Sequence, residues 1–374
     1  MIIGILKEIA GDKRVAMLPD QAGVLVKSGV EVWVEAGAGA ASFATDEQYL
    51  AKGMKVTTSA DIFSHAAILI TFNPLSETAY ATLQKNTVLI GVYQPLFNVS
   101  LVQHIANKGL SLFSLDMIPR TTRAQAMDVL SSQANIAGYK AVLKAADLLP
   151  HYFPMFMTAA GSIAPAKVLI LGAGVAGLQA IATAKRLGAV VEVSDTRPAV
   201  KEEVMSLGAK FIEVEGAADA SKAGGYAVEQ SEEFKQKQLA RLSESVAKSD
   251  VIIATAQLQG KKAPLLITDA MLQLMKPGSV VIDLAASSGG NIEGTVNNDI
   301  VVKHGITIVG NSSLAADMPA DASKVYGKNM FNFLQLIIDK NAELVLNFDD
   351  ELVKGCCITH AGEIVHDRIK ELIK

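Results

Sequence analysis

The stretch KVLILGAGVAGLQAIATAKRLGAVVEVSD, residues 167–195, decides the fold of this chain. It begins with an apolar strand at 168–171, continues through a glycine-rich turn into a helix at 178–187, and ends with a second apolar strand at 190–193. A strand, a helix and a second strand in this order form a βαβ unit, in which the two strands run parallel. The stretch therefore predicts a parallel sheet covered by helices.

The turn after the first strand has glycines at the three positions of a dinucleotide-binding fingerprint. Gly172 lets the chain turn tightly, Gly174 removes a side chain where a pyrophosphate must approach the backbone, and Gly177 lets the helix pack close to the strand. The N-terminal N–H groups and positive dipole end of the helix would then face the phosphates. Two other interpretations are a glycine-rich turn that binds nothing and a membrane span, but the apolar stretch is shorter than the ~20 residues that a span needs.

Asp195 ends the second strand 18 residues after Gly177. A carboxylate at this position can accept hydrogen bonds from both ribose hydroxyls of NAD, and it repels the 2′-phosphate of NADP. Arg197, two residues further on, weakens this preference without reversing it. The sequence therefore predicts a site for NAD(H) rather than NADP(H).

Length and composition restrict the class of protein. The chain has 374 residues, of which 50% are hydrophobic and 19% charged, and its net charge is −4. This length predicts two domains that each bury a core, and the mild acidity gives no electrostatic reason to expect a nucleic-acid partner. No apolar run reaches the length of a membrane span, and residues 1–14 lack the pattern of a secretory signal, so we expect a cytoplasmic protein.

Cysteine and histidine give no sign of a metal site. Cys356 and Cys357 are adjacent, form no CxxC motif and would be strained as a disulfide, so we expect buried thiols. The six histidines are scattered, without an HExxH motif or a cluster. The sequence therefore predicts no metal.

Short apolar segments on either side of the fingerprint predict two sheets. The first sheet is expected to contain strands at 2–6, 30–35, 66–72, 88–93 and 110–115. The second is expected to contain, besides the fingerprint strands, 210–213, 251–254, 280–284 and 306–309. The segment 151–165, which contains two prolines, predicts a loop.

The predicted fold class is α/β, with two Rossmann-like open parallel-sheet domains joined by long helices and a cleft between them. The first domain is expected to be discontinuous, with residues 1–122 and 318–374, and the Rossmann NAD(H)-binding domain to span 150–317. Ala, Leu, Met and Gln dominate residues 123–149, so we expect a linking helix there.

The C-terminal segment is too small to fold alone, which is why we expect it to return to the first domain. Residues 324–339 form a very apolar helix, typical of a buried core or an oligomer interface. Short strands are expected to follow at 344–348, 353–359 and 364–366. This helix and these strands are where the sequence predicts a dimer contact.

The linking segment carries polar side chains at a helical spacing. If the helix begins near Arg123, then Gln125, Asp128 and Ser131 share one face. One interpretation is a polar face exposed to solvent or lying between the domains. The other is a polar clamp on the amide and ribose of a nicotinamide nucleotide.

Four blocks of the sequence resemble the proton-translocating NAD(P) transhydrogenases: RTTRAQAMDVLSSQANIAGY at 120–139, TAAGSIAPAKVLILGAGVAGLQAIATAKRLGA at 158–189, GGYA at 224–227 and KPGSVVIDLA at 276–285. The resemblance is to domain I, the NAD(H)-binding part of the alpha subunit, and it covers almost the whole chain. The sequence contains no membrane segment, so it is similar to the split-subunit form, in which domain I is a separate polypeptide.

The resemblance implies a reaction and a set of partners. Domain I would transfer hydride from NADH to NADP⁺ held on a partner subunit, so NADP(H) would not bind to this chain. Separate membrane-spanning subunits would couple the transfer to proton translocation. The resemblance also implies a homodimer that associates peripherally with the inner membrane through those partners.

Particular residues take roles from this resemblance. Four polar residues would hold the nicotinamide end of NADH, and one of them, Gln125, would also reach the NADP-bearing partner: Arg120, Gln125, Asp128 and Ser131. Further cofactor positions are Gly172, Gly174, Val175 and Gly177 at the pyrophosphate, Asp195, Thr196 and Arg197 around the adenosine ribose, Gly225 and Tyr226 on a mobile loop, and Gln238 and Gln257. Two residues depart from the family pattern: Gln257, where leucine is more common, and Asp317, where a basic residue is usual.

Alanine dehydrogenase, whose fold is the same, is the main alternative. An amino-acid dehydrogenase needs a proton donor and acceptor beside the hydride, and that family places a lysine and a histidine in the first domain. Here residues 70–73 contain no lysine, residues 66–103 contain no histidine, and Arg14, which resembles that family's substrate arginine, is alone. Hydride transfer between two nicotinamide rings needs only proximity, orientation and exclusion of water. A non-catalytic NAD-binding module is the remaining alternative.

Overall fold

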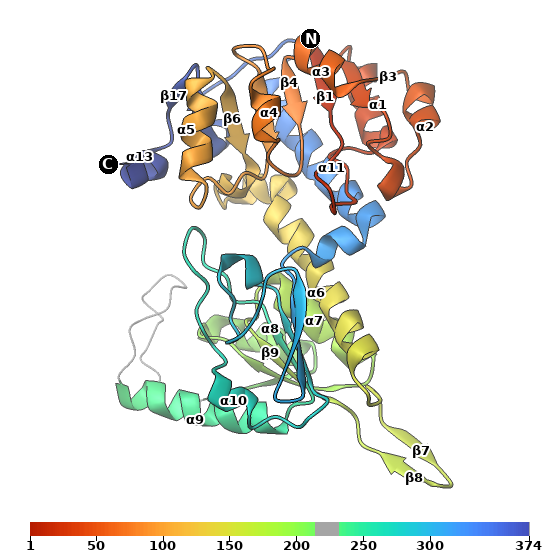
Figure 1. Cartoon of the computed structure of the whole chain (residues 1–374), viewed down its shortest axis with the longest axis vertical. Helices are drawn as coiled ribbons and strands as arrows, with labels where there is room; N and C mark the ends of the chain where they lie inside the picture. The colour runs from red at the N-terminus through yellow and green to blue at the C-terminus, as the bar shows by residue number, and fades with distance from the viewer. Residues whose placement is uncertain (214–231, 374) are drawn as a thin grey trace. The chain divides into compact units, whose positions relative to one another are not determined.

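The computed structural model describes residues 1–213 and 232–373 (Figure 1). The chain divides into two compact units, which we call unit 1, Met1–Gln133 with Ala316–Lys374, and unit 2, Ala134–Ala315. The first boundary falls within helix α6, Val129–Leu148, so the first residues of this helix belong to unit 1 and the rest to unit 2.

Unit 1 contains a sheet with the strand order β3-β2-β1-β4-β5-β6-β16-β17. Neighbouring strands are parallel from β3 to β6, and β16 and β17 extend the sheet as antiparallel strands. The strands are β1 Ile2–Ile5, β2 Glu31–Glu35, β3 Lys55–Thr57, β4 Ile68–Ile70, β5 Val88–Gly91, β6 Ser111–Ser114, β16 Cys357–His360 and β17 Glu363–Ile364. The helices are α1 Pro19–Lys27, α2 Asp46–Ala51, α3 Ser59–His65, α4 Glu77–Tyr80, α5 Val99–Asn107, α11 Pro319–Ile337, α12 Glu351–Cys356 and α13 Asp367–Ile373.

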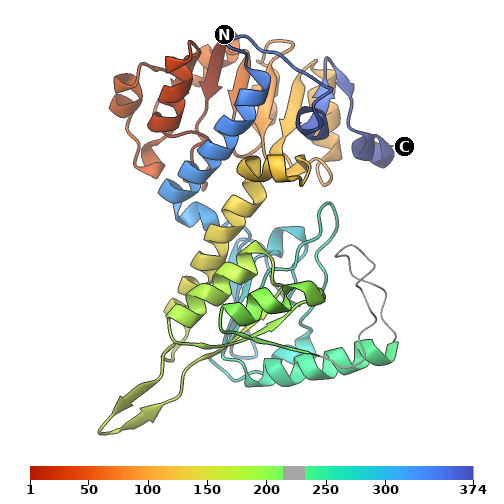
Figure 2. The same cartoon turned by 180° about the vertical axis from the view of Figure 1, so that it is seen from behind.

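Both faces of this sheet are buried, which explains why its strands read as continuous apolar runs. Ile68 and Ile70 of β4 pack in one core with α1 and α11, and Leu69 packs in a second core with α3 and α5. Figure 2 shows α11 lying across one face of the sheet. The C-terminal segment therefore completes the core of unit 1.

Unit 2 contains a sheet with the strand order β11-β10-β9-β12-β13-β15-β14, parallel except for β14. The strands are β9 Lys167–Leu171, β10 Val190–Ser194, β11 Lys210–Phe211, β12 Val251–Ala254, β13 Val280–Asp283, β14 Asp299–Lys303 and β15 Ile306–Gly310. The helices besides α6 are α7 Val175–Arg186, α8 Lys201–Ser206, α9 Glu232–Lys248 and α10 Asp269–Leu272. Helices α6, α7 and α8 contribute to one core, and α9 and α10 to the other.

The two sheets have the same doubly wound order. In each, the chain first builds outward in one direction from a central strand, β1 or β9, and then crosses back to add strands on the other side. The order reverses between β1 and β4 in unit 1 and between β9 and β12 in unit 2. In open α/β sheets, ligands bind outside the carboxyl ends of the strands at such a switch point. The predicted α/β fold with two Rossmann-like sheets is confirmed.

The linking helix begins later than the sequence predicts. Residues Thr122–Met127 form a 3-10 helix, η3, and α6 begins at Val129. The carboxylate of Asp128 accepts the N–H of Ser131 at 2.9 Å, as an N-cap residue does. The expectation that Gln125, Asp128 and Ser131 share a helix face was wrong, because an aspartate that bonds nearby backbone N–H groups favours a helix start over a helix interior.

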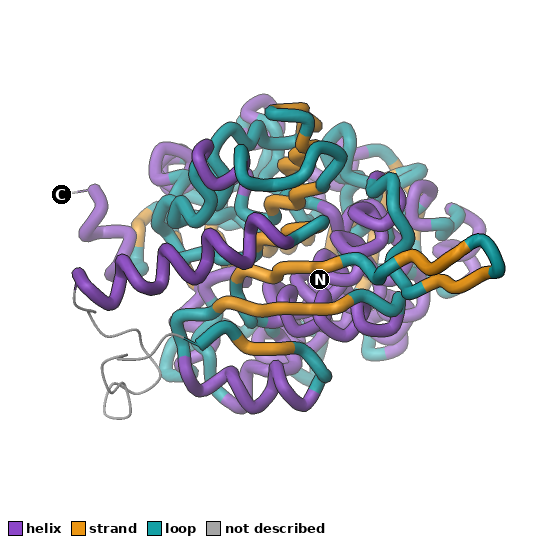
Figure 3. Tube along the Cα trace, turned by 90° about the horizontal axis from the view of Figure 1, so that it is seen from below, coloured by secondary structure: helices purple, strands orange, loops and turns teal. Residues whose placement is uncertain are grey.

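The segment 151–165, predicted as a loop, contains a hairpin of β7, Phe156–Thr158, and β8, Gly161–Ile163. All its strand residues are exposed, and it extends away from the rest of unit 2 (Figures 1 and 3). Since neither face packs on a core, the segment carries no alternation that would predict strands.

Other predictions of strands require correction. Edge strand β14 was not predicted, because its residues are mostly exposed. Residues 344–348 form no strand beyond the single bridge of Leu344 to Ile338. The start of the predicted strand 353–359 lies instead in α12. Asp350 caps this helix by accepting the N–H of Leu352 at 2.8 Å. Helix α11 packs most of its apolar residues into the core of unit 1, as the buried-core interpretation predicts, while the dimer contact at this helix stays a prediction.

Cys356 and Cys357 are free buried thiols, as predicted, and burial raises the pKa of Cys357 to about 12. Within the described residues, no helix combines the length and apolarity required to cross a membrane. The same residues contain no group of three or more His, Cys, Asp or Glu side chains arranged to hold a metal ion.

Candidate functional site

Two of the three fingerprint glycines are required by the chain itself. Gly172 follows β9 with φ +96°, a left-handed conformation that favours glycine, and a Cβ there would lie 2.7 Å from Thr255 Oγ1. Gly177 lies in the first turn of α7, where a Cβ would lie 1.9 Å from the carbonyl oxygen of Gly172. Close packing of strand, turn and helix therefore accounts for both residues.

Gly174 is different. Its φ of −79° suits any residue, and a Cβ there would meet no heavy atom of the described chain within 4 Å. It stands at the N-cap of α7 without a side-chain cap, and the first N–H groups of a helix have no partner within the helix. Neither backbone strain nor packing explains this glycine, so the open space beside it and the unpaired N–H groups define a candidate anion site.

Asp195 follows β10 and is bonded on both carboxylate oxygens. Oδ2 accepts Ala173 N–H at 2.7 Å, and Oδ1 accepts Arg197 N–H at 2.8 Å. The guanidinium of Arg197 donates to the two oxygens at 3.0 and 2.9 Å. Burial works against the charge of Asp195, but the Arg197 guanidinium and these N–H groups outweigh it and hold its pKa below the usual range. Asp195 is therefore ionised at neutral pH and fixed to the glycine turn.

The other predicted residues of unit 2 are less closely grouped. Val175 opens α7 and is 40% exposed, and Thr196 is exposed beside Asp195. Gln257 follows β12 at the carboxyl edge of the sheet, where its amide donates to the carbonyl of Leu284 at 2.8 Å. Gln238 is half-buried in α9. Gly225 and Tyr226 lie outside the described residues.

The predicted nicotinamide-binding residues lie in unit 1, between β6 and the start of α6. Ser131 donates its hydroxyl to Asp128 Oδ2 at 2.6 Å, in addition to the capping bond, so these two side chains hold each other. Arg120 and Gln125 are exposed. Asp317, noted in the sequence as a departure from the family pattern, is exposed at the end of the 3-10 helix η6, Leu314–Asp317.

Arg14 belongs to a network that the sequence did not reveal. Its guanidinium bonds both oxygens of Asp12, at 2.6 and 2.9 Å, and donates to Gln133 Oε1 at 3.1 Å. It also lies over the ring of Phe72, with 3.7 Å between Cζ and the ring centroid. The sequence did not reveal this network, because Gln133 and Phe72 come from distant parts of the chain.

Glu8 lies at the switch point of unit 1 and was also missed. One carboxylate oxygen accepts Phe72 N–H at 2.5 Å, and the other accepts the backbone and side-chain N–H groups of Asn73, each at 3.0 Å. Burial raises the pKa of the Glu8 carboxyl to about 7, although these donors oppose the shift. An ionisable network thus fills the edge between β1 and β4.

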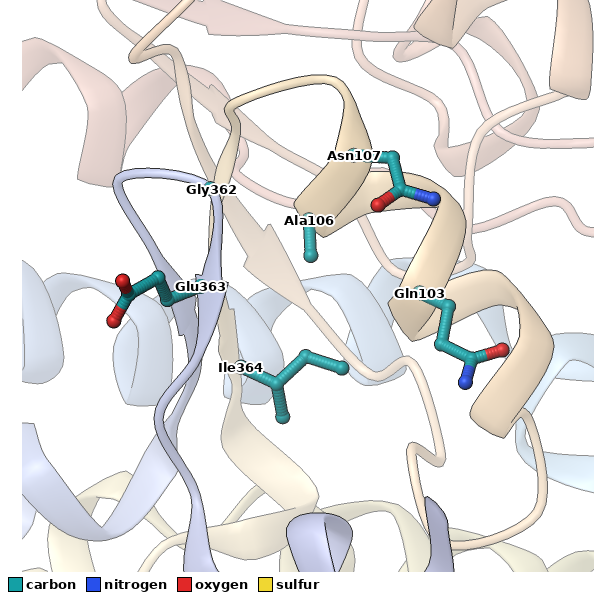
Figure 4. A pocket seen from close by; sticks show the side chains of 6 residues that line it. All are labelled: Gln103, Ala106, Asn107, Gly362, Glu363 and Ile364. Carbon is teal, nitrogen blue, oxygen red and sulfur yellow. The ribbon is translucent and has the colours of Figure 1, made fainter. Parts of the chain in front are cut away.

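A surface depression of about 610 Å³ lies elsewhere in unit 1 (Figure 4). Its lining comes from α5, with Gln103, Ala106 and Asn107, and from the β16–β17 hairpin, with Gly362, Glu363 and Ile364. Its polar side chains are exposed, so no preorganised group marks it as a ligand site.

Comparisons with known proteins agree with this arrangement. Two models of the alanine dehydrogenase/PNT family match, the N-terminal domain over residues 4–137 and the C-terminal domain over residues 141–367. The polypeptide that forms the first part of the NAD(P) transhydrogenase alpha subunit in Rhodospirillum rubrum is 45% identical over 376 residues, which cover 98% of each chain.

Two solved structures extend the comparison. The crystal structure of transhydrogenase from Sinorhizobium meliloti has a TM-score of 0.90 and 43% identity, and the match covers 98% of this chain and 100% of that one. An L-alanine dehydrogenase has a TM-score of 0.81 at 23% identity, covering 100% and 99%, which shows a shared fold alone. The chain therefore belongs to the alanine dehydrogenase/PNT family of oxidoreductases and, within it, to the NAD(P) transhydrogenase alpha subunits.

Proposed function

We propose that unit 2 binds NAD(H) at the carboxyl edge of its sheet and that the chain transfers hydride from NADH to NADP⁺ held on a partner subunit. The observation that carries the proposal is Gly174, a glycine with open space beside it at the N-terminus of α7. A pyrophosphate placed there would meet backbone N–H groups and the positive end of the helix dipole. Val175 would line the same phosphates.

The residues after β10 favour NAD(H) over NADP(H). Asp195 is ionised and lies beside the glycine turn, so it would accept hydrogen bonds from the adenosine ribose and repel a 2′-phosphate. Its oxygens already accept four hydrogen bonds, about as many as a carboxylate has lone-pair sites. Ribose binding therefore requires the Arg197 guanidinium to move away from the carboxylate. Thr196, Gln238 and Gln257, with Gly225 and Tyr226, complete the proposed contacts.

At the nicotinamide end, we assign binding and orientation to Arg120, Gln125, Asp128 and Ser131. The Asp128–Ser131 pair is preorganised by its two mutual bonds, and the exposed Gln125 side chain is free to face a partner. In the proposed step, a hydrogen and its electron pair pass from the nicotinamide of NADH to that of NADP⁺, giving NAD⁺ and NADPH. No proton is released or taken up, so the site needs orientation and exclusion of water rather than an acid and a base.

The Arg14 network argues against the amino-acid dehydrogenase. Such an enzyme needs a cation to hold the substrate carboxylate, and Arg14 is only 9% exposed, with its charge already paired to Asp12. Gln133 and Phe72 contact the remaining parts of the guanidinium. Binding of a carboxylate there would first require this buried ion pair to break, which typically costs several kcal/mol.

The β7–β8 hairpin is the surface we assign to homodimer formation. An isolated two-stranded hairpin is marginally stable in water, so this one needs a partner surface. Met157 in β7 and Met155 just before it are 72% and 62% exposed, which leaves apolar surface for such a partner to cover. A second copy of the chain that covers the hairpin would bury them. Replacing Phe156 and Met157 with serine should shift the protein to monomers in analytical ultracentrifugation, whereas Val302→Ser, on the exposed edge strand β14, should not. An unchanged dimer in the hairpin variant would exclude this surface.

The name of the R. rubrum relative implies that its alpha subunit is divided between polypeptides. By analogy, we propose that membrane-spanning subunits and an NADP-binding domain are the partners of this chain. They would hold it peripherally at the membrane and couple hydride transfer to proton translocation.

One mixture tests the reaction. The chain, the separately produced NADP-binding domain of a transhydrogenase, NADH and an NADP⁺ analogue of shifted absorbance should together reduce the analogue. Gly174→Asp, which we expect to stay folded without binding NADH, is the matched control. Absence of turnover with the unsubstituted chain would contradict the proposal. Oxidation of NADH by pyruvate and ammonia with this chain alone would favour the amino-acid dehydrogenase instead.

A further inference from the structure

Asn291 is a fully buried amide that joins two loops at the carboxyl edge of unit 2. Its Oδ1 accepts Ala256 N–H at 3.0 Å, and its Nδ2 donates to the carbonyls of Ala256 and Pro264 at 2.9 and 2.8 Å. Two carbonyls and one N–H around one amide permit a single orientation, with Nδ2 toward the carbonyls. The side chain thus bonds both the N–H and the carbonyl of Ala256, as a residue of a neighbouring β-strand would.

Asp283, at the end of β13, holds Asn291 in place. It is fully buried, and its Oδ2 accepts the N–H groups of Asn291 and Ile292 at 2.8 and 3.1 Å and the hydroxyl of Thr295 at 2.9 Å. Its other oxygen accepts Ala285 N–H at 2.9 Å. Since every one of these donors lies on the same loop, Asp283 fixes the loop that presents the Asn291 side chain.

Ala256 connects this arrangement to the glycine turn. The preceding residue, Thr255, donates its hydroxyl to the carbonyls of Leu171 and Gly172, each at 3.1 Å. A continuous series of hydrogen bonds therefore runs from Asp283 through Asn291 to residues 255–256 and on to Gly172. It joins the carboxyl ends of β13, β12 and β9 in that order.

We infer that Asn291 is a positioning residue for the dinucleotide, one that sets where residues 255–257 lie as a wall of the switch-point crevice between β9 and β12. This inference rests on the proposed NAD(H) site. Ligands bind in such a crevice between the loops of the two flanking strands, so a displaced loop after β12 would alter the fit of the cofactor. The Asn291 side chain is fully buried, and its hydrogen-bond partners among the described residues are Ala256 and Pro264, so it would act on the cofactor through them.

Asn291→Asp tests this with a pH profile. A protonated aspartic acid keeps the acceptor for Ala256 N–H and donates to one carbonyl, whereas the ionised form places a charge against two carbonyl oxygens. Burial raises the pKa of such a carboxyl, so the change of state falls near neutral pH. The dissociation constant of the variant for NADH should rise about tenfold as the pH increases, the effect of leaving a buried polar group unpaired. The unsubstituted chain should show no such rise over the same range.

The controls distinguish an effect on the position of residues 255–257 from a general loss of folded protein. Asn297→Asp makes the same chemical change at an exposed position of unit 2 and should bind NADH as the unsubstituted chain does. Circular dichroism at each pH must show that Asn291→Asp remains folded. With the NADP-binding partner domain, the variant should show a raised KM for NADH with kcat nearly unchanged at saturation, a split that loss of folded protein would not produce.

Asn291→Ser provides a second route should the charged variant unfold. Its shorter neutral side chain reaches fewer of the three partners, so NADH should bind more weakly by a factor that does not vary with pH. Unchanged NADH affinity in folded Asn291→Ser would overturn the inference, as would a flat pH profile in folded Asn291→Asp. Failure of the unsubstituted chain to bind NADH would instead overturn the proposed function.

Discussion

The two units differ at their equivalent switch points: buried polar side chains fill the one in unit 1, whereas a glycine leaves open space at the one in unit 2. In unit 1, Glu8 follows β1 and accepts hydrogen bonds from Phe72 and Asn73, which follow β4, so a carboxylate spans the point where the strand order reverses. In unit 2, the loops after β9 and β12 are joined through the Thr255 hydroxyl, and Gly174 leaves open space beside the helix N-terminus.

The two sheets have the same strand order, so the side chains at the two switch points, rather than the fold, distinguish a filled edge from an open one. Unit 1 has filled its edge with groups that satisfy one another, including the Arg14–Asp12 pair. In unit 2, the hydrogen bonds of Asp283 and Asn291 lie on the side of β12 away from β9, where they hold the loop after β13 against Ala256. We therefore propose the switch point of unit 2 as the dinucleotide site, whereas the switch point of unit 1 is occupied by the chain's own polar side chains.

The largest expected effect is on NADH affinity, when a side chain is placed in the open space beside Gly174. Gly174→Asp should weaken NADH binding on the order of a thousandfold, about 4 kcal/mol, because the carboxylate would occupy the proposed pyrophosphate position and repel it. Aspartate is a favoured N-cap residue, so the helix should not lose stability. Isothermal titration with NADH measures the loss, and thermal unfolding checks the fold.

Gly174→Asn separates charge from bulk, since asparagine caps helices equally well and has nearly the same shape. It should bind NADH more weakly than the unsubstituted chain but more tightly than Gly174→Asp. Equal affinity of all three proteins would remove Gly174 from the site and with it the contrast between the two edges.

The filled switch point should give the next largest effect, on stability rather than binding. Burial raises the pKa of Glu8 from 4.5 to about 7 in the folded chain. Between these values the folded chain retains a proton that the unfolded chain has released, so the contribution of Glu8 to stability is greatest below about pH 4.5 and falls as the pH rises. The loss attributable to Glu8 is about 3 kcal/mol by about pH 8.

Glu8→Gln should remove this pH-dependent loss because glutamine does not titrate. Urea unfolding between about pH 5 and pH 8 measures the effect as the difference in slope between the two proteins. Glu77→Gln, at an exposed position, is the control and should follow the unsubstituted chain. Parallel pH profiles for Glu8→Gln and the unsubstituted chain would show that Glu8 does not titrate in this range.

Asp195→Asn is expected to have a smaller effect on affinity and a change in preference. Loss of the charge-assisted bond to ribose should weaken NADH binding by about 1–3 kcal/mol. The Arg197 guanidinium would lose its carboxylate partner and could then pair with a 2′-phosphate, so NADPH should bind more tightly than to the unsubstituted chain.

Titration of both nucleotides measures this switch, and a double variant identifies its cause. Adding Arg197→Ala to Asp195→Asn should remove the gain in NADPH affinity. Unchanged NADH affinity in the single variant would show that Asp195 serves only to fasten the glycine turn through Ala173.

The sequence predicts an element well when the contacts that determine it join residues close together in the chain. The stretch 167–195 yields its strand, turn, helix and strand correctly because apolar runs and glycines act within a few residues. The start of α6 was misplaced because Asp128 was interpreted by its spacing on a helix face rather than as a cap. The β7–β8 hairpin was missed because exposed strands leave no hydrophobic pattern.

The polar networks could not be predicted because folding brings their members together from afar. Glu8 and Phe72 are 64 positions apart, and Arg14 and Gln133 are 119 apart. Asn291 lies 35 positions from Ala256, and the sequence around it offers only two preceding glycines as a signal of a turn. The fingerprint, including Gly174, was predictable from its residues alone, whereas the buried polar network that fills the switch point of unit 1 was not.

The smallest expected effect concerns the exposed Gln125, which belongs to neither switch point. Gln125→Asn shortens the side chain by one methylene while keeping its amide, so NADH affinity should remain nearly unchanged. Hydride transfer to an NADP⁺ analogue should slow about tenfold, because a small displacement of the reacting rings lowers the rate steeply. Single-turnover absorbance measurements with the partner domain separate these two quantities. A loss of NADH affinity with an unaltered transfer rate at saturation would place Gln125 at the cofactor rather than at the partner, and unit 1 would then contribute more to NADH affinity than the contrast between the two switch points implies.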